Sequence, residues 1–459
     1  MATQGQNYTI RPIIEWIYEA KYLSKIALPM IMSHVFIILI EVTDSIMASS
    51  LGPLNLAAIA VSNSILYPII LALIGLTMVL SPVVAKYRGR KDFHSLNKAM
   101  TSMIAIAIAV GLLMTGLMTL IIKLMPTMGI DATVIPYVSA YMEARFLGIV
   151  PFAIYLVFRF YFEGRAKTST VMKATAIAFV CNIPLNWVLM TGWGIFPAMG
   201  IKGIGLSTSI IEILLCLLMM WKWHQYFFEK YFRYDKTIAP TQKMITKLLR
   251  LGIPSGLAYA AEVGMFAIMG IALSRISAIS VAAHQVALSV SAVTFIIPLG
   301  IAGGLASRIG YLTGKSNSTV ALKRAIKLGI GAIVLVMGLS SIILWTQAVS
   351  IASLYSSDAM IIASATQLIM VVALYQLFDG TQVAFNGILK GFHDTQIPMW
   401  MVLFSYWVIG FGSGMALSKH TSIPELGVWY GIALGLVVSA TLLGARVLKK
   451  MNDFSKTGH

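Results

Sequence analysis

Hydrophobic residues in this chain occur in long, nearly continuous runs that are separated by short polar stretches. Each run reaches the roughly 20 residues that an α-helix needs to cross the hydrocarbon core of a bilayer. A strand of a transmembrane barrel would instead alternate apolar and polar residues. The pattern therefore predicts an all-α integral membrane protein with twelve transmembrane helices. The predicted spans are 24–50, 56–84, 99–123, 134–162, 169–192, 201–222, 248–274, 281–307, 324–346, 359–389, 396–418 and 426–446.

The composition supports a membrane protein over a soluble one. Of 459 residues, 58% are hydrophobic and only 11% are charged, whereas a soluble domain carries about 25% charged residues. The formal net charge is +17, which in a soluble protein would suggest nucleic acid as a partner. Here the basic residues lie mostly in loops between the apolar runs, so no nucleic-acid partner is expected.

The distribution of Lys and Arg predicts the orientation in the membrane. They gather in every second loop and in the tail, and the alternate loops, such as 50–55 and 192–200, are nearly uncharged. Because cytoplasmic loops are enriched in Lys and Arg, both termini are predicted to be cytoplasmic. The first residues do not resemble a cleavable signal peptide, so the first span is expected to remain as an anchor.

The two halves of the chain repeat each other. Pro29 corresponds to Pro254, Gly75 corresponds to Gly300 at the same offset, and the segment that begins at Gly164 matches the one that begins at Gly391 at nearly that offset. Each half has an even number of spans, so both copies share one orientation. This predicts two six-helix bundles related by a pseudo-two-fold axis along the membrane normal, with a substrate cavity between them. The predicted parts are a cytoplasmic N-terminal segment 1–23, an N-terminal lobe 24–222, a cytoplasmic linker 223–247, a C-terminal lobe 248–448 and a cytoplasmic tail 449–459.

Acidic residues inside spans are the strongest candidates for function. A charged side chain at the bilayer centre costs at least about 2.5–3.5 kcal/mol on insertion scales, so each one needs a reason. Two arginines, Arg145 and Arg159, also lie well inside a span, the same one for both, and Glu143 is the acid of that span. The acids within spans are Glu41, Asp44, Glu143, Glu212, Glu262 and Asp379.

Glu262 and Asp379 lie in the middle of their spans, and Tyr375 is one helical turn before Asp379 on the same face. Two carboxylates and a phenolic oxygen suit Na⁺, a hard cation that prefers oxygen ligands. A carboxylate in a low-dielectric site also readily holds a proton, which suits proton transport. The alternative is that each acid pairs with a Lys or Arg of a neighbouring helix and has only a structural role.

Asp44 has possible polar neighbours in Asn182, Asn186 and Thr208 of the same half. Such Asn and Thr side chains commonly join membrane helices by hydrogen bonds, and for these three that structural role is the favoured alternative. His284 and Gln285 either line the cavity or form an interhelical hydrogen bond of the same kind.

The sequence contains no catalytic or cofactor motif that we recognise. HExxH, GxSxG and paired Cys/His clusters are missing from it, and the two cysteines, Cys181 and Cys216, both lie inside apolar runs. We therefore expect neither an enzyme nor a cofactor, and the only bound ion expected is a coupling ion, Na⁺ or H⁺.

Several segments resemble the MATE (multidrug and toxic compound extrusion) family, specifically its NorM-type bacterial branch, from about residue 23 to residue 448. The segments that carry the resemblance are IALPM at Ile26–Met30, VTDSIMA at Val42–Ala48, EGRAKT at Glu163–Thr168, NIPLN at Asn182–Asn186, VAAHQVAL at Val281–Leu288, YQLFDGTQV at Tyr375–Val383 and GILKGFHDT at Gly387–Thr395.

The resemblance implies two groups of cation-binding or coupling positions. In the C-terminal half the family's positions match Glu262, Tyr375 and Asp379, which would be the Na⁺ ligands in a Na⁺-coupled protein. An aromatic position for cationic ligands matches Phe295, which keeps the capacity for cation–π contact. Glu41 and Glu212 depart from the NorM pattern, and Glu41 is a candidate for the substrate cavity. In the N-terminal half the family's positions match Asp44, Asn182, Asn186 and Thr208.

The resemblance implies a secondary multidrug antiporter of the bacterial inner membrane. It would export lipophilic, often cationic compounds in exchange for Na⁺ or H⁺ and would act as a monomer in the bilayer. A flippase of lipid-linked precursors from the same superfamily is the first alternative, although it would be expected to need a more cationic cavity. A channel is the second alternative, although it would not need carboxylates poised for exchange.

Overall fold

The computed structural model describes residues 3–226, 239–274, 276–316, 318–421 and 423–456, and their side chains from Ile13 onward. Part of the predicted linker 223–247 and the last three residues of the predicted tail therefore lie outside the described residues. The described chain is helical and has no β-strand; one isolated bridge joins Trp193 and Phe196 between two helices.

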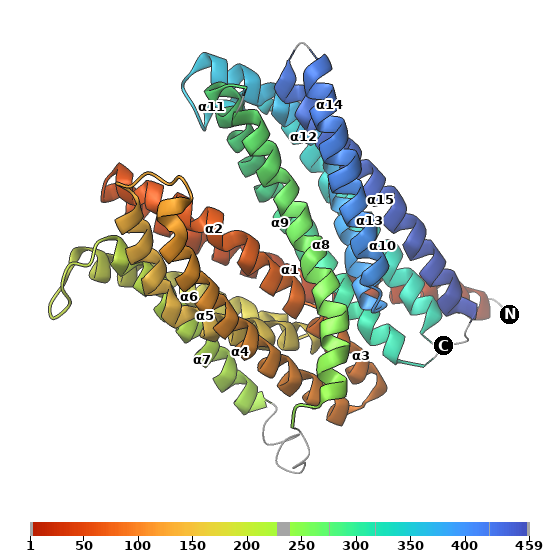
Figure 1. The fold of residues 1–459 in the computed structure, drawn as a ribbon. Helices are drawn as coiled ribbons and strands as arrows, with labels where there is room; N and C mark the ends of the chain where they lie inside the picture. The colour runs from red at the N-terminus through yellow and green to blue at the C-terminus, as the bar shows by residue number, and fades with distance from the viewer. Residues whose placement is uncertain (1–2, 227–238, 275, 317, 422, 457–459) are drawn as a thin grey trace. The chain divides into compact units, whose positions relative to one another are not determined.

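Figure 1 shows the helices, whose bounds follow from the apolar runs and from the turns between them. They are α1 (Thr3–Ser50), α2 (Pro53–Thr77), α3 (Leu80–Arg90), α4 (Phe93–Leu124), α5 (Ile135–Gly164), α6 (Thr168–Thr191), α7 (Ile201–Trp223), α8 (Gln242–Ser274), α9 (Ala278–Gly314), α10 (Thr319–Thr346), α11 (Ala348–Ser353), α12 (Ala359–Gly391), α13 (Gln396–Leu403), α14 (Gly412–His420) and α15 (Pro424–Lys456), with a 3₁₀ turn at Met125–Thr127 and a π-helix at Phe404–Phe411.

Within the described residues, twelve helical segments are long and apolar enough to cross a membrane. This confirms the predicted all-α membrane architecture. Two of the twelve are interrupted: α2 and α3 form one span, and α13, the π-helix and α14 form another. Short helix α11 connects two spans and is not itself long enough to cross the bilayer.

The chain divides into two compact units. The N-terminal unit is Met32–Gly256, and the C-terminal unit combines Met1–Ile31 with Leu257–His459. Two helices, α1 and α8, are therefore shared, because each changes unit part way along its length. The predicted N-terminal segment 1–23 is helical from Thr3, as the first part of α1.

The first part of α1 is held within the C-terminal unit by a buried ion pair and by apolar packing. Arg308 on α9 donates two hydrogen bonds of 2.6 Å to the carboxylate of Glu19, and its guanidinium lies 4.2 Å from the ring centroid of Tyr22. Leu23 and Ala27 belong to the hydrophobic core of the same unit. The start of the chain is thus a structural part of the C-terminal half.

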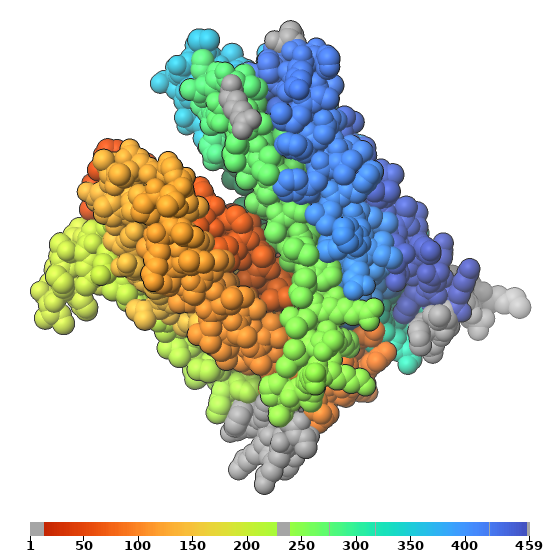
Figure 2. Space-filling model, in the orientation of Figure 1, coloured from red at the N-terminus to blue at the C-terminus, as the bar shows by residue number. Residues whose placement is uncertain are grey.

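The first part of α8 is held within the N-terminal unit by apolar packing and a hydrogen bond. Met244 and Leu248 belong to its hydrophobic core. The backbone N–H of Thr241, just before α8, lies 3.4 Å from the Ser102 hydroxyl of α4, and Figure 2 shows the green start of α8 beside the orange surface of α4.

Matching contacts recur in the two units at the offset seen in the sequence. A Cβ atom on Gly75 would lie 2.6 Å from the Cα of Gly256, and one on Gly300 would lie 3.0 Å from the backbone nitrogen of Ile31. Gly75 corresponds to Gly300, and Ile31 corresponds to Gly256, at the same sequence offset that relates Pro29 to Pro254. Side chains at these glycines would separate helices whose backbones pack directly against each other.

Large apolar side chains cover much of the outer surface of the helices. Leu113 on α4 is 71% exposed and Leu335 on α10 is 65% exposed, and many similar residues accompany them. Exposed apolar surface of this extent is unfavourable in water and is expected where the neighbour is lipid.

Candidate functional site

Asp44 on α1 lies at the centre of a buried polar cluster in the N-terminal unit. Asn182 and Asn186 donate hydrogen bonds of 3.1 Å and 2.6 Å to Oδ1 of Asp44, and the Thr208 hydroxyl donates one of 3.0 Å to Oδ2. All four side chains are buried. The structure thus brings together the four predicted residues of the N-terminal half.

The helices explain this arrangement. Asn182 and Asn186 are one turn apart on α6, so both amides face the same carboxylate, and Pro184 lies between them inside the helix. The Asn186 amide nitrogen also lies 3.3 Å from the amide oxygen of Asn182. Thr208 comes from the neighbouring α7. Neutral donors from two helices therefore satisfy both oxygens of Asp44.

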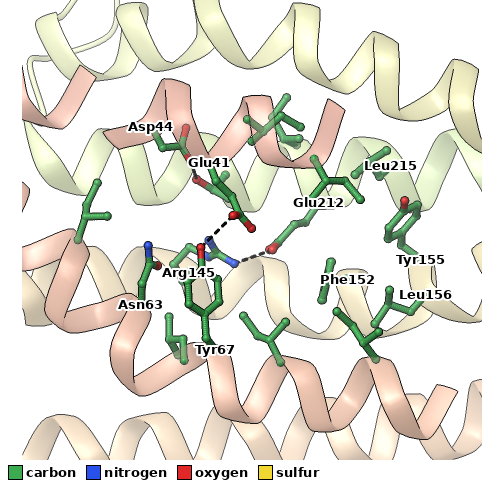
Figure 3. A pocket seen from close by; sticks show the side chains of 18 of the residues that line it. Glu41, Asp44, Asn63, Tyr67, Arg145, Phe152, Tyr155, Leu156, Glu212 and Leu215 are labelled. Atoms are coloured by element: carbon green, nitrogen blue, oxygen red, sulfur yellow. Dashed lines mark hydrogen bonds and ion pairs between the residues drawn. The ribbon is translucent and has the colours of Figure 1, made fainter. Parts of the chain in front are cut away.

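A cavity of about 150 Å³ lies beside Asp44 within the N-terminal unit. Its walls are mostly aliphatic and aromatic, and its charged lining residues come from α1, α5 and α7 (Figure 3). Glu41, predicted for the substrate cavity, lines it and accepts a hydrogen bond of 2.9 Å from the Tyr67 hydroxyl. The charged lining residues are Glu41, Asp44, Arg145, Arg159 and Glu212.

Arg145 does not pair with the acid nearest to it in sequence. Its guanidinium donates a 2.7 Å hydrogen bond to Oε1 of Glu212 on α7, whereas Glu143 is exposed. Residues two apart on a helix point in different directions, so Arg145 and Glu143 do not face each other. Arg159, in contrast, pairs with the acid nearest to it in sequence, Glu163, which lies one turn later on α5, at 3.1 Å.

Glu262 on α8 is held by a neutral partner in the C-terminal unit. The amide of Gln382 on α12 donates a 3.0 Å hydrogen bond to its Oε1, and both side chains are buried. Asp379, also buried, is three residues before Gln382 on α12 and interacts electrostatically with Glu262. Lys390, further along α12, also acts electrostatically on Glu262.

Tyr375 is buried one turn before Asp379, as predicted from the sequence. Its hydroxyl lies 3.2 Å from the Ser291 hydroxyl of α9, and its ring stacks on Trp429 of α15 at a centroid distance of 6.3 Å. Tyr406 of the π-helix is fully buried and interacts electrostatically with Glu262 and Asp379. π-helical turns are frequent at functional sites.

The remaining predicted residues have different surroundings. His284 is buried, with its ring edge-on to Trp429 at 5.5 Å, whereas the next residue, Gln285, is exposed. Phe295 is half-buried on α9. Within the part of the chain that the structure describes, no group of three or more His, Cys, Asp or Glu side chains could hold a metal. A cation at Glu262 and Asp379 would therefore need the neutral oxygens nearby.

Sequence reasoning did not identify several of these partners. Gln382 was detectable, because it is seven residues after Tyr375 and three after Asp379 and so shares their helix face. Tyr67, Ser291 and Trp429 come from other helices, and nothing in their local sequence marks them.

Ion pairs elsewhere differ from these two clusters. Buried or partly buried pairs join Arg308 to Glu19 and Arg446 to Asp394. Among the residues described, no Lys, Arg or His lies within 4.0 Å of the carboxylates of Asp44, Glu262 or Asp379. Within the described part of the chain, these three acids are therefore not members of salt bridges.

Comparison with known proteins identifies relatives along almost the whole chain. The sequence profile of the MatE family matches residues 29–188 and 254–415. The two matched segments begin at Pro29 and Pro254, the prolines that first revealed the repeat.

Bacterial relatives cover nearly the same length. A protein of Photorhabdus laumondii named "Probable multidrug resistance protein NorM" is 31% identical over 434 residues, which are 93% of this chain and 94% of the relative. A protein of Shewanella oneidensis with the same name is 31% identical over 444 residues, 94% of this chain and 95% of the relative.

Solved structures share the fold at lower identity. A MATE crystal structure in a bent conformation matches with a TM-score of 0.86 at 18% identity and covers 96% of this chain and 97% of that one. The eukaryotic MATE transporter AtDTX14 matches with a TM-score of 0.85 at 18% identity and covers 97% of this chain and 100% of that one.

Proposed function

The chain belongs to the MatE family, and from this premise we propose that it is a multidrug efflux antiporter of a bacterial inner membrane. It exports lipophilic, often cationic compounds in exchange for Na⁺ or H⁺. The family membership and the names of its bacterial relatives support export of drugs. The twelve spans support a multi-pass protein.

One observation supports the exchange mechanism most directly: buried acids within spans accept hydrogen bonds from neutral donors. Asp44 accepts hydrogen bonds from two amides and a hydroxyl, and Glu262 accepts one from an amide. Carboxylates in an apolar bundle need a counter-charge. Where no arginine or lysine supplies it at contact distance, a transported Na⁺ or proton can.

Exchange follows if the ion and the drug favour different conformations. An ion that binds the acids more tightly in one state shifts the protein toward that state, and the drug must bind the other state better. In this proposal Asp379, Glu262 and Tyr375 bind the ion in the C-terminal unit. Asp44 with its three partners forms a second coupling site in the N-terminal unit.

The arrangement in the membrane is also part of the proposal. The Lys-rich and Arg-rich loops support cytoplasmic termini. The glycine contacts that recur at one sequence offset support a pseudo-two-fold relation between the halves. We further propose that the protein works as a monomer.

The test is efflux of ethidium from proteoliposomes under a Na⁺ gradient and, separately, under a proton gradient. The variants are Glu262→Gln and Asp379→Asn, and the control is Glu143→Gln, an exposed acid on α5. Wild type and control should respond to at least one gradient, and both site variants should lose most of that response. Undiminished gradient-driven efflux in both variants would refute the C-terminal site. Absence of any response in wild type would refute antiport itself.

A further inference from the structure

The ion pair between Arg145 and Glu212 forms part of the wall of the cavity in the N-terminal unit (Figure 3). The two side chains come from neighbouring helices, α5 and α7, and are 13% and 8% exposed. Neither the predicted coupling sites nor the proposed exchange mechanism uses this pair.

Both partners keep unused hydrogen-bonding capacity. Nε of Arg145 and Oε2 of Glu212 are buried and have no hydrogen-bond partner among the described residues. The Glu212 carboxylate fits because residue 148 on α5 is glycine, where a Cβ atom would overlap Oε2. The pair is thus accommodated by its surroundings but is not fully satisfied by them.

The other acids of the cavity already have neutral partners. Glu41 is bonded to Tyr67, and Asp44 to its amides and hydroxyl. Arg145 acts electrostatically on both of these acids in addition to its contact with Glu212. Arg145 therefore interacts with three carboxylates of the cavity, while Arg159, the other arginine of the lining, pairs with Glu163.

A solute with only a positive charge would bind in this cavity less tightly than a zwitterion. To reach Glu212 it would have to replace Arg145 and leave a buried guanidinium without a partner, which is strongly unfavourable. A solute with both a cationic and an anionic group would replace the Arg145–Glu212 pair by two ion pairs, one with each of these side chains. The planar guanidinium is well suited to bind a carboxylate with parallel hydrogen bonds.

We propose that Arg145 determines charge selectivity, so that the cavity binds the zwitterionic end of an aromatic solute. The solute's carboxylate binds Arg145, its ammonium group binds Glu212, and its ring lies among the apolar walls. A cavity of about 150 Å³ holds a group about the size of benzene. This inference rests on the proposed function, because it names the substrate class of the same transporter.

The test compares two probes with one skeleton and a single benzene ring: phenylalanine, which is a zwitterion, and phenylalanine methyl ester, which is a cation at pH 6. Their dissociation constants are measured by equilibrium dialysis against the full-length protein in nanodiscs, without any ion gradient. In wild type the zwitterion should bind more tightly than the ester. In Arg145→Gln this preference should fall about tenfold, and Arg145→Lys should restore part of it because it keeps the charge.

A merely structural role would give a different result. If Arg145→Gln weakens both probes by the same factor, or leaves their ratio unchanged, the inference is wrong. Glu143→Gln, an exposed acid on the same helix, is the control and should keep the wild-type ratio. If Arg145→Gln does not fold, the double variant Arg145→Gln/Glu212→Gln removes both charges together, and it too should lose the preference.

The binding measurement separates this inference from the proposed function. If wild type prefers the zwitterion and the Arg145 variants lose this preference, but no gradient drives efflux, the antiport proposal is wrong and the selectivity role of Arg145 stands. If efflux responds to a gradient while the probe ratio is unaffected by Arg145, the selectivity role fails and antiport stands.

Discussion

Gln382 on α12 donates a 3.0 Å hydrogen bond to the carboxylate of Glu262 on α8. The two residues are far apart in the sequence, yet Gln382 also shares a helix face with Asp379 and Tyr375. A neutral amide thus orients one acid of the proposed ion site from the helix that carries the other.

We predict that Gln382→Leu weakens Na⁺ binding if Na⁺ is the exchanged ion. One hydrogen bond to a charged group contributes roughly 1.5 kcal/mol, so the half-saturating Na⁺ concentration should rise about tenfold. The measurement is protection against thermal unfolding as Na⁺ is titrated. Gln376→Leu is the matched control, because this buried glutamine of α12 bonds to Ser340. An equal Na⁺ response in the Gln382 variant and wild type would contradict the prediction.

Thr208→Val should reduce gradient-driven efflux. The substitution keeps the shape of the side chain but removes the hydroxyl that donates to Oδ2 of Asp44. Loss of one hydrogen bond to a carboxylate costs roughly 1.5 kcal/mol, which corresponds to about a tenfold decrease in the rate of gradient-driven efflux. Thr175→Val provides the comparison, because the buried Thr175 hydroxyl bonds to carbonyls of its own helix. The prediction fails if both variants transport ethidium equally well.

Gly300→Ala should destabilise the protein. The added Cβ would overlap a side-chain carbon of Ile31 and lie 3.0 Å from its backbone nitrogen, so α1 and α9 would have to separate. Overpacking of this kind costs about 1–3 kcal/mol. Gly331→Ala on α10 has no atom within 4 Å of its Cβ and should be neutral or slightly stabilising. Melting temperatures of the detergent-solubilised variants decide between these outcomes, and equal melting of the two variants would count against the packing.

Breaking the pair between Arg308 and Glu19 should also destabilise the fold. Arg308→Met leaves the Glu19 carboxylate buried without its partner, at a cost of about 3–5 kcal/mol. The double variant Arg308→Met/Glu19→Gln removes both charges and should recover a large part of that loss. Thermal unfolding of the two single variants and the double variant gives the coupling energy. Additive single effects would mean that the pair does not hold the start of α1.

Much of the fold was predictable from hydropathy, because the bilayer requires long apolar segments. All twelve spans were expected close to their observed places, and the repeat of the two halves was visible in prolines and glycines. Hydropathy carries no information about which helices pack together. The assignment of the first part of α1 to the C-terminal unit and of the first part of α8 to the N-terminal unit was therefore not anticipated.

Prediction of the site was also limited because hydropathy does not show which helices pack together. The one-turn spacings of Asn182 with Asn186 and of Tyr375 with Asp379 placed each pair on one face, and the structure agrees with this. The partner of Arg145 was missed, because the closest acid in sequence is not the closest in space. Contacts such as Tyr67 with Glu41 join residues of different helices, and only the three-dimensional arrangement reveals them.

The shared helices α1 and α8 have a consequence for how the protein is made. The N-terminal unit includes residues up to Gly256, so it cannot be completed on the ribosome when its own six spans have been inserted. The N-terminal unit can be completed only after the first part of α8 has been synthesised. Residues up to Ile31 can pack into their own unit only after the C-terminal half has been synthesised. Two fragments separated between α7 and α8 should therefore be poorly folded alone and should assemble when they are produced together in one cell.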